Sequence, residues 1–261
     1  MQNPNLDGHS MAPHEVEFTG GTGTLKGFLF LPPGKGPFPC VIDNHGSATP
    51  PGTTDLSHPQ TAALFLSWGC AYLFPHRAGY GNSLGVVVGD EVPAPRGTAE
   101  HDEQMSARLQ RENKDVIAAL DYVSGLDEVD ADRIIIMGSS LGGIHTLLAL
   151  AADPRWRCGV DFSGGASQWA KHPKIKQMLL DAASTLTQPV CLIQPENDFN
   201  TAPTTEIAAL LERRGHPHDA RIFPPWGTAG PEAHRFCAAG QQIWGPFVHD
   251  FLERYCNHND Q

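Results

Sequence analysis

The stretch RIIIMGSSLGG, residues 133–143, joins an apolar, β-branched run to a cluster of serines and glycines. The apolar run is typical of a buried strand, and the small residues indicate a turn too tight for larger side chains. Within this turn, residues 138–142 (GSSLG) match the pattern G-x-S-x-G in one frame, with Ser140 at its centre. Where a buried strand turns into a helix, this pattern presents a serine hydroxyl above the sheet. Ser140 is therefore predicted to be a nucleophile.

Further short, nearly continuous apolar runs lie on both sides of this stretch. Continuous apolarity indicates strands covered on both faces, which is typical of a parallel sheet. Helical patterns lie between the runs, and this alternation predicts a doubly wound α/β sheet. The predicted strands are 39–46, 70–77, 133–138, 158–164, 189–195 and 220–226, and the predicted helices are 60–68, 113–126, 141–153, 204–215 and 241–255.

Other segments modify this plan. Residues 14–20 and 24–33 alternate apolar with polar residues and predict an antiparallel hairpin at the sheet edge. Pro246 predicts that the last helix is interrupted or begins late. Two long connections, 81–112 and 165–188, are candidates for shaping a substrate pocket, the second as one or two helices crossing the top of the sheet. A surface insertion without a role remains the alternative for 81–112.

The composition limits the classes of function. The 261 residues show neither an internal repeat nor a composition shift, so we expect one domain over 1–261. The formal net charge of −11 argues against nucleic acid or an anionic membrane surface as a partner. The first residues lack a targeting pattern, and we expect a soluble cytoplasmic protein that either stays monomeric or forms a homo-oligomer. The six cysteines form neither a CxxC pair nor a cluster with zinc spacing, so neither a metal nor another cofactor is expected.

A serine nucleophile needs a base and an acid that orients the base. With the chain order Ser, acid, His, the run 189–195 leads to Asp198, with Glu196 as its nearest competitor and Asp161 as a second. Among the thirteen histidines, His234 is the one in the loop after the last predicted strand. We therefore predict a triad of Ser140, Asp198 and His234.

An ester carbonyl under attack becomes an oxyanion that needs two hydrogen-bond donors. The backbone N–H of Leu141, next to the nucleophile, is predicted to be one donor. The other is expected in the loop after the strand at 39–46, from Ser47 or Gly46, and His45 is expected to orient that loop. The candidate pocket walls are aromatic: Tyr80, Trp169, Phe199 and Trp226.

Several stretches together carry a family resemblance over almost the whole chain: GTLKGFLFLPPGKGPFPCVI, NHGS, RAGYGNSLG, GSSLGGIHTLLA, ENDFNTAP and AHRF. With these the chain resembles α/β-hydrolases of the dienelactone hydrolase and prolyl-oligopeptidase-like group. The resemblance implies the α/β-hydrolase fold, a mostly parallel twisted sheet with helices on both faces, and the same triad of Ser140, Asp198 and His234.

Three departures from that group narrow the expected activity. Dienelactone hydrolases usually carry cysteine as the nucleophile, whereas this chain has Ser140. The arginine that relatives often place directly before Gly-Tyr-Gly is Ala78 here, and Arg77 lies one position earlier. No propeller domain precedes the hydrolase region in this sequence. We expect a serine hydrolase of small or medium carboxylic esters, with peptidase or amidase, lactone hydrolase, acyltransferase and a ligand-binding protein without activity as alternatives.

Overall fold

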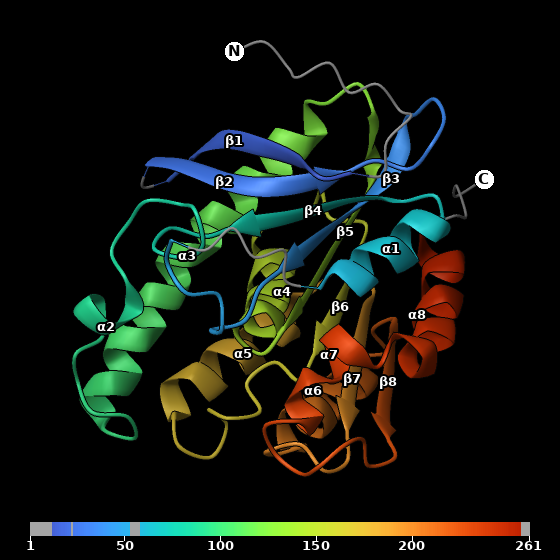
Figure 1. Ribbon diagram of the computed structural model, residues 1–261. Helices are drawn as coiled ribbons and strands as arrows, with labels where there is room; N and C mark the ends of the chain where they lie inside the picture. The colour runs from blue at the N-terminus through green and yellow to red at the C-terminus, as the bar shows by residue number, and fades with distance from the viewer. Residues whose placement is uncertain (1–11, 22, 53–57, 257–261) are drawn as a thin grey trace.

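A single sheet of eight strands forms the centre of the molecule in the computed structural model, which describes residues 12–21, 23–52 and 58–256 (Figure 1). The strand order is β1-β2-β4-β3-β5-β6-β7-β8. β1 and β2 pair antiparallel with each other, β2 is antiparallel to β4, and the remaining pairs are parallel. The strands are β1 (His14–Gly20), β2 (Gly23–Phe30), β3 (Phe38–Asn44), β4 (Ala71–His76), β5 (Val129–Ser139), β6 (Cys158–Phe162), β7 (Val190–Pro195) and β8 (His218–Phe223).

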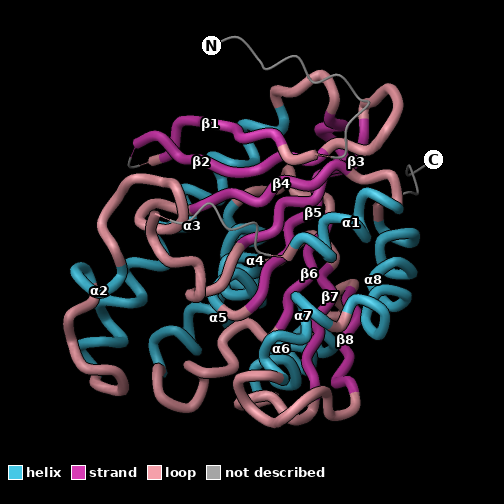
Figure 2. The backbone as a smooth tube through the Cα atoms, viewed as in Figure 1, coloured by secondary structure: helices cyan, strands magenta, loops and turns pink. Residues whose placement is uncertain are grey.

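Helices cover both faces of this sheet, as Figures 1 and 2 show. One layer contains α3, α4, α5 and α6, which pack against one another, and the other contains α1, α7 and α8. The predicted mostly parallel sheet between two helical layers is therefore confirmed. The helices are α1 (Pro59–Ser67), α2 (Val88–Glu91), α3 (Ala99–Ser124), α4 (Leu141–Ala152), α5 (Pro173–Thr185), α6 (Ala202–Arg213), η1 (Ala233–Arg235), α7 (Phe236–Ala239) and α8 (Gln241–Tyr255).

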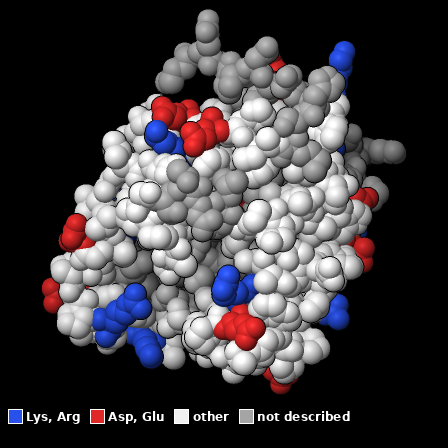
Figure 3. All heavy atoms as spheres, viewed as in Figure 1, with Lys and Arg blue, Asp and Glu red and all other residues white. Residues whose placement is uncertain are grey.

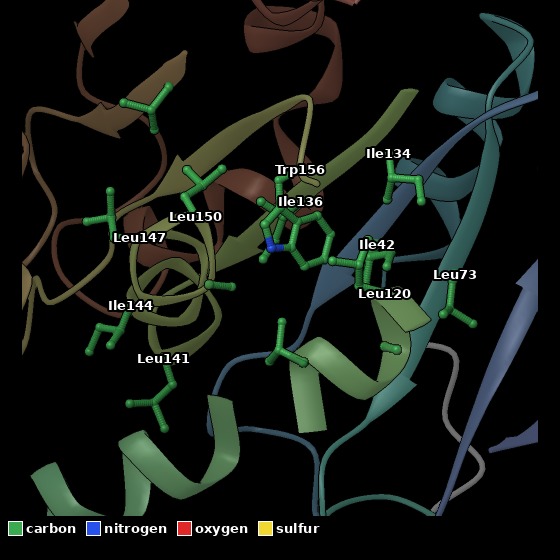
Figure 4. Packing of buried hydrophobic residues seen from close by; sticks show 14 of the residues in the cluster. Ile42, Leu73, Leu120, Ile134, Ile136, Leu141, Ile144, Leu147, Leu150 and Trp156 are labelled. Atoms are coloured by element: carbon green, nitrogen blue, oxygen red, sulfur yellow. The ribbon is translucent and has the colours of Figure 1, made fainter. Parts of the chain in front are cut away.

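The continuous apolar runs arise because each buried strand contributes side chains to two hydrophobic cores, one on each face of the sheet. In β5, Ile134 and Ile136 face the cluster under α3 and α4, whereas Ile135 and Met137 face the cluster under α1 and α8. Figure 4 shows part of the first cluster, where Ile144 belongs to helix α4. Successive strand side chains point to opposite faces, so a strand buried on both faces needs an apolar residue at every position.

Three segments differ from the sequence-based expectations. Helix α3 begins at Ala99 instead of 113, because the Thr98 hydroxyl accepts a hydrogen bond from the N–H of His101 and caps the helix. Residues 81–112 thus contain the first half of α3. Residues 165–188 hold α5, which packs against α3, α4 and α6 in one helical layer instead of crossing the top of the sheet. Helix α8 runs through Pro246 without interruption.

The surface carries no continuous patch of one charge on the face in Figure 3, where described Lys, Arg, Asp and Glu residues lie in small separate groups. Across the described residues, no helix combines the length and the apolarity that crossing a bilayer requires. Nor do these residues contain a group of three or more His, Cys, Asp or Glu side chains placed to hold a metal ion.

Candidate active site

Ser140 lies at the sharp turn between β5 and α4. Its backbone has φ 60° and ψ −115°, in a region that non-glycine residues rarely adopt. The turn is held by two backbone hydrogen bonds: Ser140 N–H donates to Phe162 O at 2.9 Å, and Ile144 N–H donates to Ser140 O at 3.1 Å. A strained serine at this junction is the geometry that exposes a nucleophile above the sheet.

The glycines on both sides of Ser140 are required by close backbone contacts. A Cβ on Gly138 would lie 2.4 Å from the carbonyl carbon of Gly142. A Cβ on Gly142 would lie 1.8 Å from the carbonyl oxygen of Asn44, at the end of β3. Strand, helix and the neighbouring strand therefore meet at distances that exclude side chains, as the sequence pattern predicts.

His234 and Asp198 form a hydrogen-bonded pair at the ends of two neighbouring strands. Asp198 follows β7, and His234 lies in η1, beyond β8. His234 Nδ1 lies 2.9 Å from Asp198 Oδ1 and 3.1 Å from Asp198 Oδ2. The Asp198 side chain is fully buried, whereas that of His234 keeps 16% of its surface exposed. This arrangement fixes which ring nitrogen of His234 carries the proton and leaves Nε2 for chemistry.

The surroundings of Asp198 keep its carboxyl group ionised. Burial alone would raise the pKa of Asp198, but the hydrogen bond and charge of His234 and a hydrogen bond from Ser163 lower it below its usual value. Gln194 Nε2 donates to Asp198 Oδ2 at 3.0 Å, and the N–H of Phe199 donates to Oδ1 at 2.6 Å. An ionised carboxylate here accepts the hydrogen bond of His234 Nδ1 and holds the imidazole ring in one orientation.

A cavity of about 540 Å³ is shared by Ser140 and His234. Ser140 and His234 both line it, and so do Gly46 and Ser47 of the loop after β3. A Cβ on Gly46 would lie 3.4 Å from Ser140 Cβ, so this loop runs directly beside Ser140. The other lining residues are His45, Ala48, Thr49, His58, Pro59, Gln60, Ser139, Arg235 and Ala238.

The comparisons with known proteins agree with the fold described above. An esterase from Pyrococcus furiosus superposes with a TM-score of 0.67 at 18% identity, over 98% of this chain and 96% of the esterase. The chain has the α/β-hydrolase fold. Residues 72–175 match the model of the prolyl oligopeptidase family, in agreement with the group that the sequence resembles. The family match supports a serine hydrolase.

Two curated proteins are similar in sequence to part of the hydrolase. The quorum-quenching protein AidA of Acinetobacter baumannii (strain MDR-ZJ06) is 28% identical over 152 residues, which are 58% of this chain and 43% of AidA. The acyltransferase drtE of Aspergillus calidoustus is 32% identical over 150 residues, which are 57% of this chain and 42% of drtE. The match thus covers less than half the length of each relative.

The two competing carboxylates, Asp161 and Glu196, make other contacts. Asp161, on β6, is buried and accepts a hydrogen bond from the N–H of Gly164 at 2.8 Å. Burial raises the pKa of Asp161 to about 7. Glu196 is exposed, and its N–H donates to Phe223 O at 2.8 Å. Of the three candidate carboxylates, Asp198 is the one that forms a hydrogen bond with His234 Nδ1 in the described part of the chain.

The predicted aromatic walls are not among the residues that line the cavity. Trp169 and Tyr80 are 4% and 3% exposed, and Trp169 belongs to the core between α5 and α6. Trp226 packs on Phe236, with ring centroids 5.7 Å apart. Phe199 is 49% exposed and lies against the His234 ring at 5.0 Å, so it borders the site from outside. None of the four therefore lines the cavity of Ser140 and His234, because the sequence around an aromatic residue does not determine whether its ring packs in the core or beside a site.

Asn197 was not predicted from the sequence, although it joins the loop that carries Asp198 to the loop that leads to His234. Its Nδ2 donates to the carbonyl oxygens of Trp226 and Gly227, both at 3.1 Å, and its Oδ1 accepts from Trp226 N–H. A further hydrogen bond joins the same two loops, because Gly230 N–H donates to Asn197 O at 2.9 Å. Asn197 directly precedes Asp198, so a polar residue beside the predicted acid was the available signal.

A buried network of charged side chains supports the loop that begins at His45. Arg77 donates to His45 O at 2.9 Å and to Glu112 at 3.0 Å. Glu112 also accepts hydrogen bonds from Arg108 and from His145 of α4. Burial, followed by the charge of Arg77, holds the pKa of His45 well below its usual value. His45 thus anchors its loop through the network, and the same network reaches α4, the helix that follows Ser140, through His145.

Proposed function

We propose that this protein is a serine hydrolase of small or medium carboxylic esters, with Ser140 as nucleophile, His234 as base and Asp198 as the acid that orients His234. The observation that carries the proposal is that Ser140 and His234 line one cavity while Asp198 holds the opposite side of the imidazole. The described residues that line this cavity of about 540 Å³ include Ser47, Thr49 and Gln60 and no long apolar side chain, which favours small substrates over long acyl chains.

The reaction proceeds in two steps. His234 Nε2 takes the hydroxyl proton as Ser140 Oγ attacks the ester carbonyl carbon, and Asp198 stabilises the imidazolium. The tetrahedral intermediate collapses, the bond to the alcohol oxygen breaks, and His234 donates its proton to the leaving alcohol. Water then attacks the acyl-enzyme by the same route, which releases the acid and restores Ser140.

Two backbone N–H groups would hold the oxyanion of each intermediate. Leu141 is the first residue of α4, where backbone N–H groups have no partner inside the helix and the helix dipole favours negative charge. Ser47 lines the cavity beside the nucleophile. Loss of one such donor typically costs about 3–4 kcal/mol of transition-state stabilisation.

The test is hydrolysis of p-nitrophenyl acetate, butyrate and octanoate by the wild type and by Ser140→Ala, with Ser167→Ala as a matched control. Ser167 is exposed and bonds Gln168 at the surface. We expect the wild type and Ser167→Ala to cleave the short esters, and Ser140→Ala to lose about 10⁴-fold or more in kcat. Activity that survives in Ser140→Ala would refute the proposed nucleophile.

Peptide or amide hydrolysis is the second candidate, favoured by the match to the prolyl oligopeptidase family. It uses the same groups but must protonate a poorer leaving group. A p-nitroanilide measured beside the esters distinguishes the two, because a peptidase would turn it over at a rate close to that of the ester. Added alcohol tests acyl transfer, which the similarity to drtE favours, by the appearance of a second ester product.

A further inference from the structure

A second histidine–carboxylate pair lies on the wall of the catalytic cavity. His58 Nδ1 is 2.7 Å from Asp43 Oδ2, and the hydroxyl of Tyr72 donates to the same oxygen. His58 lines the cavity that also contains Ser140 and His234. None of the steps described above uses this pair.

The surroundings of this pair are unfavourable for the stability of the folded protein. Asp43 lies on β3 with its side chain fully buried, and its Oδ1 has no hydrogen-bond partner among the described residues. A buried charge is unfavourable unless partners compensate it. His58 has φ 70° and ψ 39°, in the left-handed region, and directly precedes Pro59, which disfavours helical conformations at that position. Strain of this kind is concentrated at binding and catalytic sites.

The ring of His58 is held in one orientation. Because a carboxylate only accepts hydrogen bonds, Nδ1 carries the proton that is donated to Asp43. Phe74 packs against the ring edge at 5.8 Å between centroids. The side chain keeps 14% of its surface exposed. With Nδ1 facing Asp43, Nε2 lies on the opposite edge of the ring, where its lone pair can accept a hydrogen bond.

We propose that His58, held by Asp43, is a substrate-binding residue whose Nε2 accepts a hydrogen bond from a hydroxyl or amide N–H group of the ester substrate. This inference rests on the proposed function and specifies its substrate class: short esters that carry a hydrogen-bond donor near the scissile bond. The cavity wall agrees with this class, because Thr49, Gln60 and Arg235 line it together with His58.

The experiment compares esters with and without a hydroxyl group. p-Nitrophenyl β-hydroxybutyrate against butyrate tests the acyl side, and hydroxyethyl butyrate against propyl butyrate tests the alcohol side. The variants are His58→Phe and His58→Asn; asparagine tolerates the left-handed backbone but does not extend to the position of Nε2. His249→Phe is the matched control, since His249 lies on α8 with 41% of its side chain exposed.

We expect the wild type and His249→Phe to prefer the hydroxylated member of at least one pair about tenfold in kcat/KM, mainly through KM. Both His58 variants should lose this preference, so that the two esters of each pair are cleaved with similar kcat/KM. An unchanged preference in both variants would overturn the inference, and so would an equal loss on both esters of each pair.

Labelling of Ser140 by a fluorophosphonate separates this inference from the proposed function. If the wild type cleaves no ester, ester hydrolysis fails, and binding is then read from protection against labelling. β-Hydroxybutyramide or N-hydroxyethyl butyramide should protect about tenfold better than its unhydroxylated counterpart in the wild type and equally in His58→Phe. Equal protection in the wild type would overturn the role of His58.

Discussion

Replacing Glu112 by glutamine removes the central negative charge of the network under the loop at 45–49. The Glu112 side chain is 2% exposed and accepts hydrogen bonds from Arg77, Arg108 and His145. Burial alone would raise the pKa of Glu112, but the His145 hydrogen bond and the two guanidinium charges lower it well below its usual value. In Glu112→Gln, two guanidinium groups that are each 1% exposed would face a neutral amide.

The burial of these charges determines how much folding free energy the substitution should cost. Breaking a buried ion pair by removing one charge typically costs about 3–5 kcal/mol. Arg108 keeps its ion pair with Glu91, and Arg77 keeps its bond to His45 O, so we expect the lower end, about 3 kcal/mol. At about 2 °C per kcal/mol for a chain of this size, Tm should fall by about 6 °C.

Thermal unfolding followed by circular dichroism at pH 7 measures this change, with urea unfolding as a second determination. Glu103→Gln is the matched control, because Glu103 lies on the same helix and pairs with Lys174, but its side chain is 65% exposed. Exposed pairs contribute about 0–1 kcal/mol, so this control should shift Tm by about 2 °C or less. Equal shifts in the two variants would refute a stabilising role for the buried network.

Two further predictions concern the carboxylates near the site. Asp198→Asn should lower kcat on p-nitrophenyl acetate about 10⁴-fold, whereas Asp161→Asn should retain it within a few-fold; the reverse result would exchange their roles. The pKa of Asp161 is raised to about 7 in the folded protein, whereas an unfolded aspartate has a pKa of about 4. Between about pH 4 and pH 7 the folded state therefore binds one proton more than the unfolded state, and the free energy of unfolding falls as the pH rises through this range. Asp161→Asn should therefore stabilise the protein at pH 8, by up to about 4 kcal/mol, and much less at pH 5, as measured by urea unfolding. The same gain at both values would exclude titration of Asp161.

The sequence by itself was sufficient for the fold and for the turn that carries Ser140. A parallel strand buried on both faces must be apolar at every position, so its signal is local. The glycines around Ser140 are likewise a local signal, because backbones that approach within van der Waals distance tolerate no side chain. The chain order of serine, acid and histidine narrowed the other two candidates to Asp198 and His234.

Only the tertiary structure decided which distant side chains meet in and around the cavity. Asp43 and His58 are fifteen positions apart, and Arg77 and Glu112 are thirty-five apart, yet each pair is in hydrogen-bond contact. Contacts of this kind depend on the pairing of strands and on the direction in which each side chain points. The aromatic residues failed as predicted walls for the same reason: hydrophobicity alone places a ring equally well in the core, as for Trp169, or beside the site, as for Phe199.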